Sequence, residues 1–140
     1  MPHTAPSFHP EEYKRRVNLL LNELSEMGLD VSPASEDDWA NFVAANKAGV
    51  SFKIGLDANG LKIQNRINFD LPDDSDLQEY ANQLNSQTIV SKIVCLGGSV
   101  LFNAFYPLIP SSGESEFGIF MTYIMDDIQS VSEHIKEIAN

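Results

Sequence analysis

The chain has 140 residues and a mass of 15.5 kDa, a size typical of one domain with one hydrophobic core. It carries 20 Asp and Glu against 9 Lys and Arg, and the resulting net charge of −11 disfavours nucleic acid and anionic lipid as partners. The hydrophobic fraction of 43% argues against disorder, and no apolar run reaches the roughly 18–20 residues of a membrane-spanning helix.

The N-terminal part of the sequence predicts a flexible tail over residues 1–9, followed by a single domain over residues 10–140. Pro10, Glu11 and Glu12 suit the first turn of a helix, where proline is tolerated and acids complement the helix dipole. An apolar stripe with helical spacing follows, and Gly28 stands where a C-terminal cap belongs. The stripe consists of Tyr13, Val17, Leu20, Leu21 and Leu24.

Residues 30–38 are polar and predict a connecting segment. The following segment is ambiguous, and residues 36–48 suit either a strand or a short helix. Ser35 to Asp38 resembles a capping box, after which Trp39, Phe42 and Val43 would share a helix face. We favour a strand, because strands clearly follow.

Residues 50–69 predict a β-hairpin with one apolar and one polar face, because apolar residues alternate strictly with polar ones. The sequence Asp57-Ala58-Asn59-Gly60 supplies its loop, since Asn-Gly tolerates positive φ. Ser75 and Gln78 then match a capping box for a helix that starts at Asp76 and ends near Gln87.

A second predicted hairpin joins residues 88–96 and 99–108 through Gly97 and Gly98, and it is apolar on both faces. In its second strand, Leu101 and Phe105 oppose the face that holds Val100, Phe102, Ala104 and Tyr106. A strand that is apolar on both faces needs cover on both, and in so small a domain another chain could supply one of them.

The last predicted helix spans residues 115–138 and carries a heptad-like apolar stripe. This pattern favours a helix that lies across the sheet, with an inter-subunit helix as the alternative. The order α-β-β-β-α-β-β-α predicts an α+β fold, an antiparallel sheet with helices on one face. The stripe consists of Phe117, Met121, Ile124, Ile128, Val131, Ile135 and Ile138.

The residues that usually carry chemistry are sparse. The three histidines lack metal-ligand spacing, and neither a phosphate-binding loop nor a nucleophile motif occurs, so we expect no metal, no cofactor and no enzymatic activity. The only cysteine, Cys95, excludes an intrachain disulfide and is interpreted as a buried apolar residue. Asp126 and Asp127 fall between stripe positions and are expected to face water. Residues 1–8 lack the segments of a signal peptide, which favours a cytoplasmic location.

Four segments of the sequence resemble the YbjN-like family of bacterial sensory transduction regulators, which is similar in fold to the type III secretion chaperones. They are residues 49–54, residues 61–69, the helix end at residues 81–85 with the hairpin after it, and the Gly113 loop before the long last helix. The resemblance implies a non-enzymatic, cytoplasmic, homodimeric protein that holds a partner protein on apolar patches. It supplies no catalytic residues.

These patterns together predict a protein-binding regulatory domain, and the expected interaction surface joins the second hairpin to the first half of the last helix. Residues 67–140 carry −9 of the net charge, which favours a basic protein as the partner. The alternative is a small-molecule-binding or enzymatic domain with a cleft between sheet and helices near Tyr80, Tyr106 and Tyr123. The expected interaction residues are Leu101, Phe105, Phe117, Phe120, Met121 and Ile124.

Overall fold

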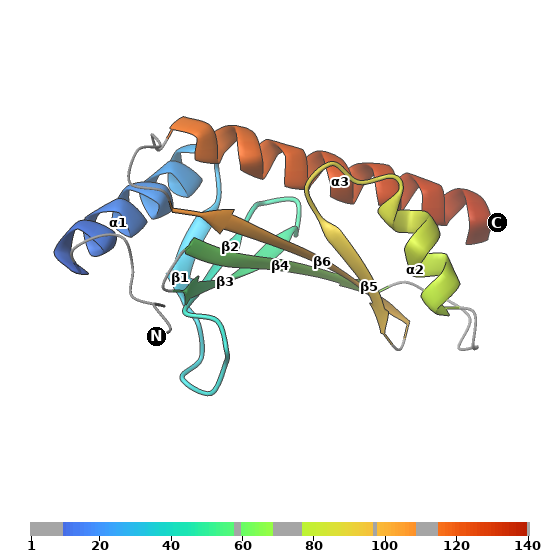
Figure 1. Cartoon of the computed structure of the whole chain (residues 1–140), viewed down its shortest axis with the longest axis horizontal. Helices are drawn as coiled ribbons and strands as arrows, with labels where there is room; N and C mark the ends of the chain where they lie inside the picture. Colours follow the sequence, from blue (N-terminus) through green and yellow to red (C-terminus); the bar gives the residue numbers. More distant parts are fainter. Residues whose placement is uncertain (1–9, 58–59, 69–76, 97, 109–114, 140) are drawn as a thin grey trace, which may run out of the picture. The chain divides into compact units, whose positions relative to one another are not determined.

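The computed structural model describes residues 10–57, 60–68, 77–96, 98–108 and 115–139, which form three helices and six strands (Figure 1). In chain order these are α1 (Pro10–Glu26), β1 (Asp30–Pro33), β2 (Phe42–Ala45), β3 (Ser51–Asp57), β4 (Gly60–Asn68), α2 (Leu77–Asn85), β5 (Lys92–Leu96), β6 (Ser99–Pro107) and α3 (Ser115–Ala139). The predicted tail, the Ala58-Asn59 turn, the Ser75 cap and the Gly113 loop lie outside the described residues.

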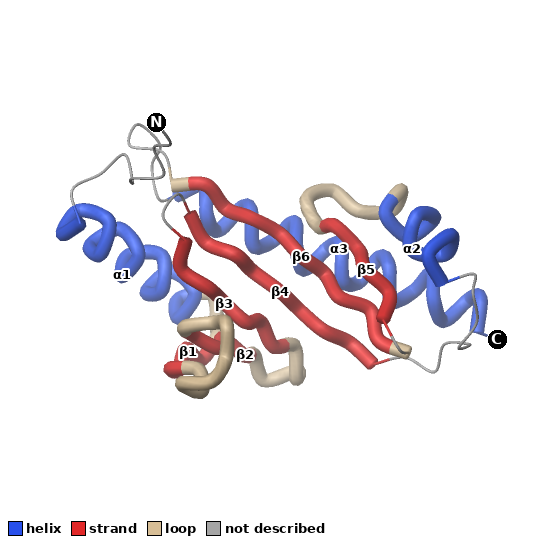
Figure 2. Tube along the Cα trace, turned by 60° about the horizontal axis from the view of Figure 1, so that its bottom comes forward, coloured by secondary structure: helices blue, strands red, loops and turns tan. Residues whose placement is uncertain are grey.

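The strands form one sheet in the order β1-β2-β3-β4-β6-β5 (Figure 2). β2 pairs antiparallel with both β1 and β3, and β5 pairs antiparallel with β6. The predicted α+β fold with an antiparallel sheet is therefore confirmed, with one strand more than expected.

The chain divides into two compact units. Among the described residues, unit 1 contains 10–57, 60–63, 105–108 and 115–119, and unit 2 contains 64–68, 77–96, 98–104 and 120–139. The elements β4, β6 and α3 each contribute residues to both units.

In unit 1, the predicted stripe of α1 faces the core. Val17, Leu20 and Leu24 are 5% exposed or less, and the helix ends before Gly28, whose φ of +92° suits a glycine cap. The ring of Tyr106 meets that of Phe117 edge to face, with centroids 4.9 Å apart. β3 contributes Phe52 and Ile54, both fully buried, and β4 contributes Leu61 and Ile63. We call the side of the sheet that carries these buried side chains its inner face.

The ambiguous segment is a strand: β2 spans Phe42–Ala45, and the favoured alternative is confirmed. The prediction of a connecting segment over residues 30–38 was wrong at its start, because Asp30–Pro33 forms β1 and pairs with β2 from Asp30↔Ala45 to Pro33↔Phe42. β1 is an edge strand, and apart from Pro33 its only apolar residue is Val31. A strand with this composition shows no alternation of apolar and polar residues, so the sequence does not reveal it.

In unit 2, the stripe of α3 is buried as predicted, with Met121, Ile124, Ile128, Val131 and Ile135 all 7% exposed or less. α2 contacts β5 and buries Ala81 and Leu84. At the end of α2, the Asn85 side chain accepts a hydrogen bond from the N–H of Ile93 (2.6 Å) and donates one to its carbonyl oxygen (3.2 Å). This amide therefore links the helix to the start of the hairpin.

The expectation that Asp127 faces water was wrong. Its carboxylate is 1% exposed and accepts hydrogen bonds from the N–H groups of Ile89 (2.5 Å), Val90 (3.0 Å) and Ser91 (2.9 Å). A carboxylate with three N–H donors can stay buried because its charge is hydrogen-bonded. The sequence predicted that a strand begins at residue 88. Because the N–H groups of residues 89–91 bind Asp127 instead of a neighbouring strand, β5 begins only at Lys92.

Candidate protein-interaction surface

The six residues predicted for an interaction surface fall into two groups. Phe105 is 43% exposed, and Leu101 and Phe120 are half-buried. Phe117, Met121 and Ile124 are at most 1% exposed, so these three belong to the core rather than to the surface. The described part of the stripe on α3 is therefore buried within the chain, and the ring of Phe117 packs against that of Tyr106 on β6.

In unit 1, two exposed aromatic rings on the outer face of the sheet lie over glycines. A Cβ atom added to Gly55 would lie 2.7 Å from Trp39 Cζ3, and one added to Gly60 would lie 2.7 Å from Phe105 Cζ and overlap the carbonyl oxygen of Tyr106. Trp39 is 49% exposed. An aromatic ring over a strand glycine covers backbone that lacks a side chain of its own. Packing within the chain therefore accounts for the position of both rings.

In unit 2, β5 and β6 place a pair of apolar side chains on the outer face. Val94 is the register partner of Leu101, and it is 37% exposed while its neighbour Ile93 on the inner face is 2% exposed. Leu101 is half-buried beside fully buried Val100 and Phe102. Figure 2 shows the strands of this unit on one side and α3 on the other. Val94 also lines a pocket between β5 and α2, together with Ala81, Asn82 and Asn85 of that helix.

Polar side chains surround this apolar pair and are bonded to one another. Gln64 on β4 donates to Asn103 on β6 (2.8 Å), and Ser99 Oγ donates to Asn68 Oδ1 (2.6 Å). Arg66 Nε donates to Ser99 Oγ (3.2 Å). We call this surface the open face of unit 2, and it consists of Gln64, Arg66, Asn68, Lys92, Val94, Leu101 and Asn103, with the buried Ser99 bonded to Arg66 and Asn68.

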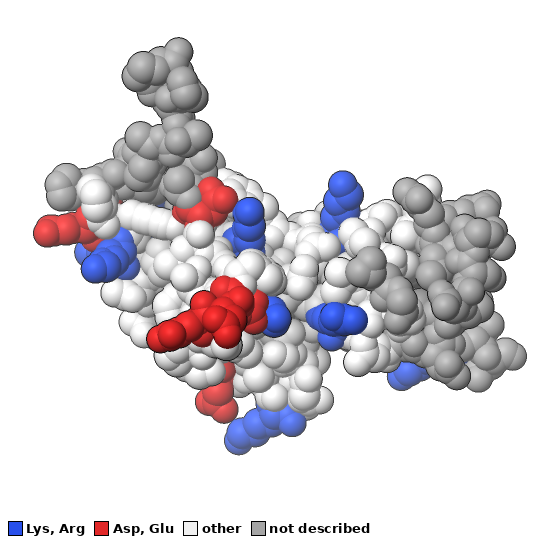
Figure 3. All heavy atoms as spheres, turned by 90° about the horizontal axis from the view of Figure 1, so that it is seen from below, with Lys and Arg blue, Asp and Glu red and all other residues white. Residues whose placement is uncertain are grey.

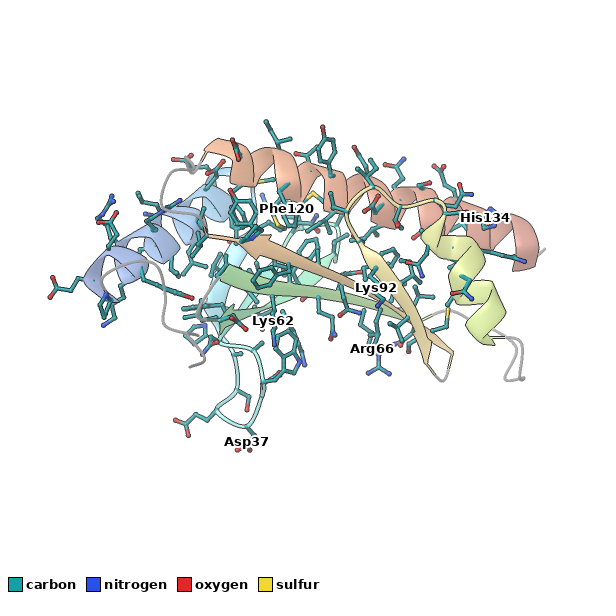
Figure 4. The ribbon with its side chains drawn as sticks, in the orientation of Figure 1. Asp37, Lys62, Arg66, Lys92, Phe120 and His134 are labelled. Atoms are coloured by element: carbon teal, nitrogen blue, oxygen red, sulfur yellow. The ribbon has the colours of Figure 1, made fainter. Side chains whose placement is uncertain are left out.

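Lys92 and Arg66 are the two cations of the open face. Both are exposed, and the Arg66 side chain points away from α3 (Figure 4). Sequence reasoning found Leu101 but missed both cations and Val94. The signal was present in the two-faced hairpin, where Val94 alternates with Ile93, but single-sequence patterning could not decide which of its two faces the helices cover.

Unit 1 contains an apolar pocket of about 380 Å³ between α1 and the strands β2 and β3. The hydroxyl of Tyr13 donates a hydrogen bond to the carbonyl oxygen of Asp57, and burial raises the pKa of Tyr13, with the nearby Asp57 charge adding to the effect. The pocket is lined by Pro10, Tyr13, Lys14, Val17, Asn18, Phe42 and Leu56.

Of the three tyrosines predicted to mark a cleft, Tyr106 and Tyr123 do not line this pocket. Tyr106 is 7% exposed in the core, Tyr123 is 41% exposed on α3, and the side chain of Tyr80 lies outside the described residues.

A second pocket, of about 440 Å³, lies between α2 and β5 in unit 2 and includes Asn82, Lys92 and Cys95 in its lining. Cys95 is half-buried, and burial raises the pKa of its thiol. A thiol with a raised pKa stays protonated at neutral pH, which is the less nucleophilic form. The pocket therefore holds a cysteine without the environment that activates one.

Comparison with models of known protein families finds no match, and a search of curated proteins finds no significantly similar sequence. The resemblance to the YbjN-like family therefore stays a prediction. Within the described residues, no three His, Cys, Asp or Glu side chains are grouped so that they could hold a metal ion. None of the described helices is long and apolar enough to cross a membrane.

Proposed function

We propose that this chain is a non-enzymatic, cytoplasmic protein-binding domain of a regulatory or chaperone-like kind, and that it binds its partner on the open face of unit 2. The observation that carries the proposal is the Val94–Leu101 pair, which lies in register on the outer face of β5 and β6, with Val94 37% exposed and Leu101 half-buried. Neither side chain lies over Gly55 or Gly60, the strand glycines that Trp39 and Phe105 cover in unit 1. Central apolar side chains with a polar rim are the usual anatomy of a protein interface.

The test is selection of binding peptides from a random display library, followed by variants of the chain. Leu101→Asp should weaken the selected peptides by about tenfold, the effect of losing a central interface residue. Ile119→Asp is the matched control, because Ile119 is 57% exposed, lies in unit 1 and contributes no residue to the open face. Thermal melts check that both variants fold. Failure to select any peptide, or equal behaviour of the two variants, would overturn the proposal.

The predicted homodimer is part of the same proposal. A dimer has twice the chain mass of 15.5 kDa in sedimentation equilibrium, and a mass that stays at 15.5 kDa at high concentration would exclude it.

The apolar pocket of unit 1 supports a second candidate function, the binding of a small and mostly apolar molecule. Its volume of about 380 Å³ falls within the range of ligand sites, and Lys14 and Asn18 add polar groups to an apolar lining. Leu56 lines the pocket and is 41% exposed, so Leu56→Trp should fill the pocket without disturbing the core. Compounds that stabilise the wild type but not Leu56→Trp in a thermal-shift screen would support this function, and a screen without such compounds would exclude it.

A further inference from the structure

Among the side chains that the structure describes in unit 2, the exposed carboxylates Asp126 and Glu133 both belong to α3, which also carries the exposed Lys136, and Asp127 is buried. The open face carries Arg66 and Lys92 and no acidic residue. Figure 3 looks onto this side of the strands, and between its centre and the grey atoms at its right-hand end the visible described atoms show blue without red.

The two cations flank the apolar pair. Lys92 is the register partner of Asn103, and it precedes Val94 by two residues on the same face of β5. The hydrogen bonds from Gln64 to Asn103 and from Ser99 to Asn68 show that β4 runs antiparallel to β6. In this register Arg66 lies opposite Leu101. Val94 and Leu101 therefore have a positive side chain on either side.

Arg66 is held in place for binding. Its Nε donates to Ser99 Oγ, and Ser99 in turn donates to Asn68, so the guanidinium is oriented before any partner arrives. Within the described residues, neither Arg66 nor Lys92 forms a salt bridge with a carboxylate, whereas Lys53 and Lys62 of unit 1 pair with Asp38 (2.8 Å) and Asp57 (3.7 Å). A guanidinium with its terminal nitrogens available is suited to a carboxylate, which it can bind through two parallel hydrogen bonds.

We infer that the open face of unit 2 binds an acidic protein segment, one that places an apolar side chain on Val94 and Leu101 and carboxylates on Arg66 and Lys92. The inference rests on the proposed function and reverses the basic partner that the charge of residues 67–140 favoured. Charges more than about 8 Å away are largely screened at physiological salt, so the side chains of the face itself decide which partner binds. A basic segment would meet two like charges there.

The test uses a display library of random peptides of about 12 residues, a length sufficient for one extended segment. Panning on the wild type should enrich Asp and Glu beside apolar residues. Panning on the charge-reversed variant Arg66→Glu/Lys92→Glu should enrich Lys and Arg instead. For one selected acidic peptide, the neutralised variant Arg66→Gln/Lys92→Gln should bind about tenfold more weakly and lose most of its salt dependence. The neutralised variant keeps the test valid if charge reversal prevents folding.

The outcomes separate the two proposals. If Leu101→Asp abolishes peptide binding while the selected peptides show no acidic bias, or while neutralising the two cations changes nothing, the protein-binding function stands and the acidic partner is excluded. If Leu101→Asp has no effect, the proposed function itself fails.

An alternative occupant of the face is a segment of this chain, because Asp70, Asp73, Asp74 and Asp76 follow β4 in the sequence. Replacing these four aspartates with asparagine should leave the acidic selection unchanged. If acidic peptides were selected only after this replacement, the occupant of the face would be the chain itself, and the inference of a separate acidic partner would be overturned.

Discussion

The outer faces of the two units expose apolar side chains for different reasons. In unit 1, Trp39 and Phe105 lie over Gly55 and Gly60, and the rings cover backbone that would otherwise be bare. In unit 2, Val94 and Leu101 pair with each other and have cations on both sides. Exposure is similar, at 43% for Phe105 and 37% for Val94, so exposure alone does not distinguish structural cover from a binding surface.

The distinction lies in what each side chain touches within its own chain. A ring over a glycine contributes to the free energy of unfolding, so removing it costs stability. An exposed side chain that contacts only a partner contributes little to the free energy of unfolding of the free protein, so its removal weakens binding instead. The two faces should therefore respond oppositely to mutation.

The largest expected effect is at the covered glycines of unit 1. Gly60→Ala should lower the free energy of unfolding by about 3 kcal/mol, because the new Cβ meets the carbonyl oxygen of Tyr106 and the Cα of Pro107, which cannot move aside. Gly55→Ala is the matched control and should cost about 1 kcal/mol, since it meets only the Trp39 side chain at close range and that ring can turn. Urea unfolding measures both. An equal loss of unfolding free energy in the two variants would show that contact with the aromatic rings, and not with the backbone, limits the space at these glycines.

In unit 2 the largest expected stability effect lies away from the open face, at Asp127. Asp127→Asn should cost about 2 kcal/mol, because the amide offers one acceptor oxygen and turns an NH₂ group toward N–H donors that the carboxylate had satisfied. Asp126→Asn changes the same charge on the exposed neighbour and should stay within about 0.5 kcal/mol. Thermal or urea unfolding compares the two. A similar cost for both variants would mean that net charge, rather than the three hydrogen bonds, matters.

The direct contrast between the two faces is a smaller effect. Phe105→Ala should lower stability by about 1 kcal/mol, because it uncovers Gly60. Val94→Thr keeps the strand propensity and nearly the size of valine, and it should leave stability within about 0.5 kcal/mol while weakening peptide binding. The comparison breaks down if Val94→Thr proves the more destabilising of the two.

The smallest expected effect concerns the ion pair between Asp38 and Lys53 in unit 1. A hydrogen bond from Lys53 Nζ (2.8 Å), and a weaker one from the N–H of Ala40 (3.3 Å), hold the pKa of Asp38 below its ordinary value. A carboxyl group with a lowered pKa in the folded state stabilises the fold above its unfolded pKa, and this contribution is lost as pH falls through the folded pKa. In Lys53→Met, NMR titration should show the pKa of Asp38 rising toward the ordinary value. An unchanged pKa would contradict the pairing.

Much of the fold could be predicted from the sequence because its helices and strands carry their periodicity openly. The stripes of α1 and α3 become the core of the structure, with Leu20 and Leu24 on α1 and Met121 on α3 fully buried. β1 could not be predicted, because a polar edge strand is defined by its partner and not by alternation. The late start of β5 depends on a carboxylate 36 residues or more along the chain, which no local pattern reveals.

The candidate site was predictable only in part, for a related reason. The two-faced second hairpin identified Leu101, but the stripe residues Phe117, Met121 and Ile124 satisfy an apolar pattern equally well in a core and at an interface, and the structure places them in the core. The charge along the chain and the charge of the open face favour different partners. The negative charge of residues 67–140 is an average along the chain, whereas the open face combines Lys92 with Arg66, which lies just outside that stretch.

The central claim, that the open face of unit 2 is the binding surface, is tested most directly by NMR titration of the isotope-labelled chain with one peptide selected from the library. The largest shift changes are expected at the amides of Val94 and Leu101 and at the side-chain Nε–H of Arg66, with little change at Tyr13 and Phe42 in the pocket of unit 1. Shift changes confined to that pocket, or none on β4, β5 and β6, would contradict the claim.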